Sequence, residues 1–296
     1  MLRGGGGVAA PGRDARGTGG AVAWSEPLTP ERPRSAGTAG SGDYYAFRVS
    51  SPAYRASRVE RADVILHLIG DVLGRSRRIA DIGTGTGIMK SVLEERSGRR
   101  IVGFELDVPF VVDRQGVVGA DACRLPVADD SFDLVLLNHV YEHVEDQPGL
   151  FREAWRVLRP GGIAYVTAGS RYAVLEPHYR LPFLSWLPRG AADAYLRASG
   201  RGRTYAGVRF LSYRGVRRLM ERAGFRVRDI TESAIGDLMR PGRGWGWRPV
   251  WMALNGLPAR VRAAALRSAS PQWFFLLEKP DMPTGDSGSA RERAHG

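Results

Sequence analysis

The sequence predicts an α/β fold built on a mainly parallel β-sheet. Short apolar runs alternate with segments of helical periodicity, and the runs are apolar throughout instead of alternating with polar residues. Strands of this kind are buried on both faces, so helices must cover both sides of the sheet. With 296 residues, 43% of them hydrophobic, the chain is long enough for one sizeable domain with additions or for two small ones.

Seven apolar runs have the length and composition of buried strands. They are residues 78–82, 100–104, 117–120, 134–137, 163–167, 225–230 and 272–277. Between the early runs, helices are expected to begin near Gly87, Val108 and Gln147. A longer apolar stripe at three- and four-residue spacing predicts a helix within 44–74, and another helix is expected over 213–223, ending at Gly224.

The domain expected from this pattern spans residues 44–280. Two long pieces, 168–211 and 231–270, break the alternation and are interpreted as insertions that cap a substrate site beside the sheet. Residues 1–43 contain few large apolar side chains, so we expect a disordered tail, with a misassigned start codon as the alternative. The polar residues 281–296 are expected to form a second disordered tail.

Charge and cysteine content restrict the function classes only weakly. The net charge of +12 would suit a nucleic-acid or membrane partner, but the arginines are spread over the whole chain. Cys123 is the only cysteine, which excludes an internal disulfide and suggests a cytoplasmic protein. No run reaches the roughly 18 apolar residues of a membrane span, and the first residues lack the apolar region of a signal peptide.

The segment IADIGTGTG joins the first predicted strand to a helix. Its glycines, Gly83, Gly85 and Gly87, allow the backbone to approach a ligand, but their spacing differs from the dinucleotide pattern G-x-G-x-x-G. Asp81 would repel a pyrophosphate and could receive a cationic amino group. The loop therefore favours a positively charged nucleoside without phosphate over NAD, and the alternative is a tight turn with no ligand.

An acidic residue follows the second strand at the distance expected for ribose recognition. Glu105 lies about twenty residues beyond the glycines, where a carboxylate can accept hydrogen bonds from both ribose hydroxyls. Asp107 is the nearby competitor and could instead cap the helix expected after it. We assign the ribose to Glu105.

These motifs resemble those of the class I S-adenosylmethionine-dependent methyltransferases, in particular the type-11 group that acts on small molecules. IADIGTGTG is similar to the first motif of that family, and GADACRLPVADDSFDLVLLNHVYEHV with FREAWRVLRPGGIAYVT is similar to the later ones. The resemblance covers about residues 79–167. It implies a Rossmann-like, doubly wound sheet of seven strands with an antiparallel last strand, and S-adenosylmethionine as the cofactor.

The resemblance also implies roles for single residues. Asp81 and the three glycines would bind the methionyl part of the cofactor, and Glu105 would bind the ribose. Thr84, within the same loop, is also counted as a cofactor-binding residue. Asp121 and Ala122 would contact the adenine, and Asn138 would lie beside the sulfonium. No residue is assigned to a metal.

Methyl transfer needs a base only when the acceptor must lose a proton. His178 is our first candidate, because it lies next to Glu176 and Tyr179 in the insertion expected to cover the substrate. His143, after the fourth strand, is the second candidate. The alternative for each is a structural histidine.

The insertions are rich in bulky apolar residues. The segment LPFLSWLP and the tryptophans and arginines within 240–267 suit a lid over an apolar substrate or a surface that contacts the inner face of a membrane. The alternative is that these segments pack on one another.

The leading hypothesis is a methyltransferase that modifies a hydroxyl of a small-molecule, glycan or lipid-linked acceptor. The alternatives are a non-catalytic module that binds S-adenosylmethionine and an RNA methyltransferase. The second is disfavoured because Asn138 and the residues after it do not form the N-P-P-Y type tetrapeptide that resembles amino-methylating enzymes. The acceptor itself, the oligomeric state and the choice among O-, N- and C-methylation stay open.

Overall fold

The computed structural model describes residues 52–238 and 248–281. The tails expected at 1–43 and 281–296 lie outside this range, apart from Asp281, and so does the segment 239–247 of the second insertion.

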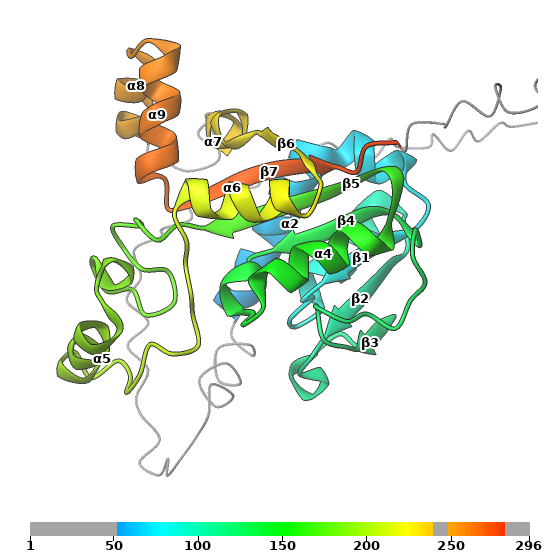
Figure 1. The fold of residues 1–296 in the computed structure, drawn as a ribbon, viewed down its shortest axis with the longest axis horizontal. Coiled ribbons are helices and arrows are strands. Elements are labelled where there is room, and N and C mark those ends of the chain that lie inside the picture. Colours follow the sequence, from blue (N-terminus) through cyan, green and yellow to red (C-terminus); the bar gives the residue numbers. More distant parts are fainter. Residues whose placement is uncertain (1–51, 239–247, 282–296) are drawn as a thin grey trace, which may run out of the picture.

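One seven-stranded sheet forms the centre of the molecule, in the order β3-β2-β1-β4-β5-β7-β6 (Figure 1). The strands are β1 (Ile79–Ile82), β2 (Ile101–Glu105), β3 (Val117–Gly119), β4 (Phe132–Asn138), β5 (Leu158–Gly169), β6 (Arg226–Asp229) and β7 (Gln272–Glu278). The first five strands pair in parallel, and β7 runs antiparallel to both of its neighbours. The sequence prediction of a doubly wound sheet with an antiparallel last strand is confirmed.

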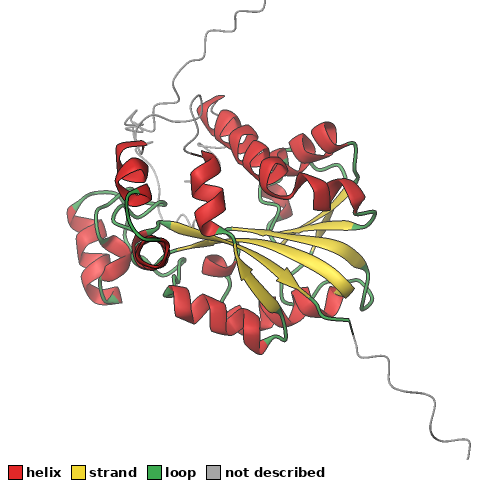
Figure 2. Ribbon diagram, turned by 90° about the horizontal axis from the view of Figure 1, so that it is seen from above, coloured by secondary structure: helices red, strands yellow, loops and turns green. Residues whose placement is uncertain are grey.

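Helices cover both faces of the sheet (Figure 2). They are α2 (Pro52–Arg75), α3 (Ile88–Ser97), α4 (Gln147–Val157), α5 (Arg189–Ala198), α6 (Tyr213–Arg222), α7 (Thr231–Leu238), α8 (Arg248–Asn255) and α9 (Ala259–Ala269). The buried residues fall into two apolar clusters: α2, α3 and α7 contribute to one, and α4, α5 and α6 to the other. Each cluster stabilises the fold by removing apolar surface from water on its side of the sheet.

The prediction of a helix that begins near Val108 is wrong. Only a single 3-10 turn, η1 (Val108–Phe110), stands there. The amides of Val112 and Asp113 both donate to the carbonyl oxygen of Thr86, at 3.0 and 3.1 Å, which ties this short connection to the glycine loop. Because no helix covers this part of the sheet, Val102 of β2 is 37% exposed.

Both lysines of the chain are buried and fixed in the fold. Lys90 donates to Glu94 across one helical turn at 2.7 Å. Lys279 donates to Asp130 at 2.7 Å and to the carbonyl oxygens of Trp155 and Leu158 at 2.9 and 2.6 Å. The exposed positive charge of the described residues therefore comes from arginine.

The first insertion begins slightly later than expected, because β5 continues to Gly169. It forms a lobe at the end of β5, and α5 is part of this lobe (Figure 1). Backbone contacts attach it to the loop after β4: the Arg209 amide donates to the Glu142 carbonyl oxygen at 2.7 Å, and the Leu211 amide donates to the Tyr141 hydroxyl at 3.2 Å. The insertion is therefore held over the carboxyl edge of the sheet.

None of the described helices combines the length and the apolar character needed to cross a membrane.

Candidate active site

The glycine loop joins β1 to α3 at the carboxyl edge of the sheet. Gly83, Gly85 and Gly87 have φ values of +69°, +61° and +75°, which side chains with a Cβ rarely adopt. A Cβ at position 87 would also collide with the carbonyl oxygen of Asp113. The sequence needs glycine here for both conformation and space.

Asp81 is buried at the end of β1, beneath this loop. The Thr84 hydroxyl donates to its Oδ2 at 2.7 Å, and its Oδ1 is buried without a hydrogen-bond partner. Burial raises the pKa of Asp81 to about 7, against the opposing effects of Thr84 and Lys90. A buried acceptor without a donor suits a ligand that brings an N–H group or an ammonium.

Glu105 lies beside the loop at the end of β2. Its carboxylate accepts from the amide of Gly85 at 2.7 Å and from that of Asp107 at 3.2 Å. Asp107 precedes η1 but makes no side-chain cap. Glu105 is therefore held next to the glycines, as ribose recognition would require.

The predicted adenine-binding residues follow β3, the neighbour of β2. Asp121 is exposed, and its Oδ1 accepts from the Cys123 amide at 2.9 Å. Ala122 is partly buried against the core. The amide of Ala120 donates to the carbonyl oxygen of Glu105 at 3.0 Å, which places this turn beside the proposed ribose site.

Asn138 ends β4, next to β1 and the glycine loop. Its amide nitrogen lies 3.6 Å from the Met89 sulfur, a weak contact. His139, which follows, has a φ of +57°, a strained conformation for a residue with a side chain. Such strain is often found at functional sites.

Glu142 is buried beside His139, and the sequence reasoning did not select it. Its Oε1 lies 3.0 Å from the His139 Nδ1, while its Oε2 is buried without a partner. Burial opposes ionisation, but the hydrogen bond from His139 and the charges of His139 and His143 keep the pKa of Glu142 below its usual range. The other ring nitrogen of His139 lies 3.0 Å from the Gln272 side-chain oxygen.

The two histidines selected from the sequence meet at this edge. The Nε2 of His178 lies 3.2 Å from the Nε2 of His143, and the two rings pack edge to face. The Nδ1 of His178 lies 2.7 Å from Oε1 of Glu176, whose side chain is buried. Neighbouring groups crowd the His143 ring, and this desolvation lowers its pKa.

Glu176 is fixed by its surroundings. The amide of Tyr179 donates to its Oε2 at 2.6 Å, and the hydroxyl of Tyr205 donates to Oε1 at 3.4 Å. These contacts hold the Glu176 carboxylate in place beside the ring of His178.

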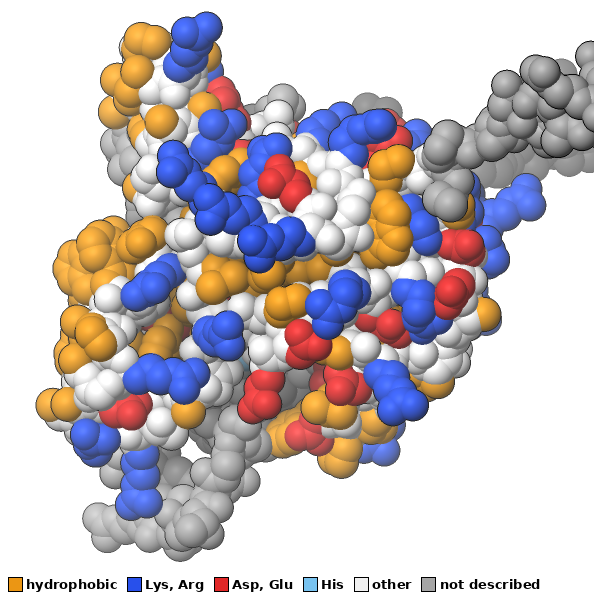
Figure 3. Space-filling model, viewed as in Figure 1, with side chains coloured by type: hydrophobic (Ala, Val, Ile, Leu, Met, Phe, Trp, Pro, Cys, Tyr) orange, Lys and Arg blue, Asp and Glu red, His pale blue; other side chains and the backbone are white. Residues whose placement is uncertain are grey.

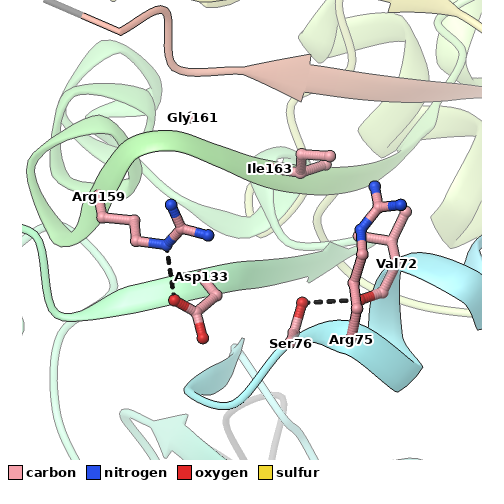
Figure 4. A pocket seen from close by; sticks show the side chains of 7 residues that line it. All are labelled: Val72, Arg75, Ser76, Asp133, Arg159, Gly161 and Ile163. Carbon is pink, nitrogen blue, oxygen red and sulfur yellow. Dashed lines mark hydrogen bonds and ion pairs between the residues drawn. The ribbon is translucent and has the colours of Figure 1, made fainter.

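A pocket lies at the opposite, amino-terminal edge of the sheet, and polar side chains that line it take part in contacts that hold the fold together (Figure 4). Its central carboxylate, Asp133, accepts from the amides of Arg77 and Arg78, each at 2.8 Å, and from the Arg159 guanidinium at 2.7 Å. These donors satisfy Asp133, so this carboxylate serves the fold.

Comparisons with known proteins identify the family of the chain. A family model described as a methyltransferase domain matches residues 80–166. The demethylmenaquinone methyltransferase of Thermus thermophilus is 30% identical over 171 residues, 51% of this chain and 76% of the relative. The malonyl-[acyl-carrier protein] O-methyltransferase of Geobacter sulfurreducens is 31% identical over 210 residues, 67% of this chain and 71% of the relative.

A solved structure shares the fold. The S-adenosylmethionine-dependent methyltransferase of Archaeoglobus fulgidus has a TM-score of 0.51 and 14% identity, covering 80% of this chain and 99% of that one. Together, the glycine loop, the sheet order and the relatives show that the chain belongs to the class I S-adenosylmethionine-dependent methyltransferases of the type-11 group.

Proposed function

We propose that this S-adenosylmethionine-dependent methyltransferase modifies a hydroxyl group of a small-molecule acceptor, and that His178 is its general base. The contact of His178 with buried Glu176 on one side and with His143 on the other carries this proposal. Deprotonation of a hydroxyl is the step for which a methyltransferase needs such a base.

The contacts fix the protonation of the His178 ring. The carboxylate of Glu176 accepts a hydrogen bond, so the Nδ1 of His178 carries the proton, and the Nε2, which lies 3.2 Å from the Nε2 of His143, is the nitrogen that takes the proton of the acceptor. Glu176 then stabilises the imidazolium that forms, as the carboxylate of a catalytic triad does. His143 faces the same nitrogen and can share the proton.

The cofactor-binding residues form the second part of the proposal. Asp81 and the glycine loop would hold the methionyl part, and Glu105 the ribose. The Oδ1 of Asp81, which has no hydrogen-bond partner, and the open space beside Gly85 fit such a ligand. Asp121 and Ala122 would contact the adenine, and Asn138 the region of the sulfonium.

When bound, S-adenosylmethionine supplies an electrophilic methyl group. The protein then has to orient the acceptor in line with that group, remove its proton and exclude water. His178 removes the proton, and the insertion that carries it covers the carboxyl edge. The insertion thus serves as the substrate cap.

The surface of this cap favours an acceptor with an apolar part, such as a lipid-linked molecule. Large apolar side chains on it are about half exposed: Tyr172, Val174, Leu175, Phe183 and Trp186. Hydrophobic side chains gather on this side of the molecule in Figure 3. An apolar surface of this kind suits binding of a hydrophobic partner or peripheral contact with a membrane.

The structure of the second insertion supports peripheral contact with a membrane less than its sequence does. Arg240, Arg243, Trp245 and Trp247 lie outside the described residues. Arg262 pairs with Glu232 at 2.6 Å and Arg267 with Asp229 at 3.3 Å, so both serve contacts within the chain. Co-sedimentation with anionic vesicles at low salt tests peripheral binding, and protein that stays in the supernatant would rule it out.

The proposed base is tested with His178→Ala and a matched control, His67→Ala, which removes a histidine on α2 that pairs with Asp237. Labelled S-adenosylmethionine is offered with a panel of hydroxylated metabolites and glycolipids. We expect His178→Ala to lower turnover by roughly 100-fold or more and to leave S-adenosylhomocysteine affinity unchanged. Normal turnover in His178→Ala, or a product methylated on nitrogen, would contradict the proposal.

A further inference from the structure

The outer face of the first insertion carries a continuous apolar surface, which we call the cap face. Its half-exposed side chains are Tyr172, Val174, Leu175, Phe183 and Trp186. The Trp186 ring packs edge to face with the rings of Tyr172 and Phe183, with ring centroids 5.7 and 5.3 Å apart. The Phe183 amide donates to the Val174 carbonyl oxygen at 2.7 Å. These contacts join the five residues into one surface.

The backbone of the insertion holds these side chains at the surface. Leu181 and Leu184 are buried on either side of Phe183. Phe183 itself has a φ of +57°, a left-handed conformation that costs energy for a bulky residue. The Trp186 indole donates to the Ala173 carbonyl oxygen at 3.0 Å, so its polar atom is satisfied within the protein and its ring stays half exposed. Large apolar side chains that stay exposed in a cluster mark an interaction surface.

The charge of the first insertion is positive at the surface. Every arginine within residues 171–209 is exposed, and this stretch contains no lysine. Its two acidic residues are engaged within the insertion: Glu176 is buried beside His178, and Asp193 accepts from the Tyr205 amide at 2.6 Å. The cap face is therefore complementary to an anionic surface, and the combination of apolar side chains with arginines is typical of contact with anionic lipids.

A second apolar surface lies on the same side of the molecule. Met252, Leu257 and Val261 are exposed on the helix pair formed by α8 and α9. This helix pair and the first insertion both project from the side on which hydrophobic side chains gather (Figure 1, Figure 3). Residues 248–270 contain no acidic residue. Two segments far apart in the sequence can thus contact one extended partner, such as a bilayer, at the same time.

We propose that the cap face docks the enzyme on an anionic membrane surface, from which a lipid-linked acceptor reaches the active site. The proposal rests on the function proposed above, because it gives the location from which that site takes its acceptor. His178 lies in the loop that joins Leu175 to Pro182, and these two residues pair as an antiparallel bridge. The proposed base is therefore carried by the same short hairpin that would contact the membrane.

Co-sedimentation with two kinds of vesicle tests the docking. One kind is phosphatidylcholine alone, and the other contains about 30% phosphatidylglycerol, which supplies negative charge. The wild type should bind the anionic vesicles about tenfold or more tightly than the neutral ones, and salt at about 0.5 M should release it. Replacing exposed Arg171 and Arg189 together by glutamine should weaken binding to the anionic vesicles about tenfold. No binding, or equal binding to both kinds of vesicle, would refute the proposal.

A second variant removes apolar side chains from the cap face. Phe183→Asn takes away a ring, and asparagine tolerates the left-handed backbone at this position. Combined with Leu175→Ser, it should weaken binding to anionic vesicles about tenfold or more, because less apolar surface then enters the bilayer. The matched control is Leu106→Asn, which removes a more exposed apolar side chain directly after β2, outside the insertion. If the combined variant binds vesicles as tightly as this control does, the proposal is wrong.

The docking and the proposed function can fail separately. His178→Ala should bind vesicles as the wild type does, so normal turnover in His178→Ala would overturn the base and leave the docking intact. The variant with Phe183→Asn and Leu175→Ser should keep its affinity for S-adenosylhomocysteine, which shows that it is folded. Gel filtration tests a different occupant, a second copy of this chain. A wild-type dimer that this variant does not form, together with protein that stays free of vesicles, would refute membrane docking.

Discussion

Replacing Asp81 with asparagine should remove the pH dependence of cofactor binding. In the ligand-free protein, burial raises the pKa of Asp81 to about 7. A ligand with an ammonium group binds the ionised carboxylate, so affinity follows the ionised fraction. With a pKa near 7, that fraction rises from about a tenth at pH 6 to about nine tenths at pH 8.

The same shift affects stability in the opposite sense. The folded-state pKa lies above the usual value for aspartate, so between about pH 4 and pH 7 the folded protein binds more protons than the unfolded chain does. The ligand-free protein therefore loses stability as pH rises through this window, by at most about 4 kcal/mol. Asparagine needs no ionisation, so Asp81→Asn should flatten this loss.

Calorimetry with S-adenosylhomocysteine at pH 6, 7 and 8 measures the first effect. Wild-type affinity should rise about tenfold across the series, and Asp81→Asn should bind about 10- to 100-fold more weakly at pH 8, the loss of one charged hydrogen bond. Urea unfolding at the same pH values measures the second effect. Equal affinity at pH 6 and pH 8 in the wild type would refute the reasoning, because Asp81 would then not titrate in the binding site.

Three further substitutions test other parts of the structure. Glu176→Gln should lower turnover at least tenfold, because the ring of His178 loses its carboxylate acceptor, and should leave the affinity for S-adenosylhomocysteine unchanged. Wild-type turnover in this variant would argue against a role for the contact. Gly87→Ala should lower the free energy of unfolding by about 1–3 kcal/mol in urea and weaken cofactor binding. If both values equal those of the wild type, a Cβ at this position does not collide with the carbonyl oxygen of Asp113. Lys279→Met should cost about 2–4 kcal/mol, since it leaves buried acceptors without a donor, and a loss below 1 kcal/mol would mean that water replaces the lysine.

The sheet could be predicted from the sequence because its strands are marked by continuous apolar runs, and each of the seven runs forms a strand. The connection after Glu105 could not be predicted from the sequence. A short, partly apolar segment between two strands is usually a helix, but here the amides of Val112 and Asp113 bond to Thr86 instead. Such a tertiary contact overrides local preference and leaves no pattern in the segment itself.

The cofactor loop was predictable for a related reason. Its function depends on backbone conformation and close approach, and glycine spacing reports both directly. The catalytic part depends on contacts between distant segments: His143 and His178 meet only because the insertion bonds back to the loop after β4. Sequence marked each histidine as a candidate, but not their contact.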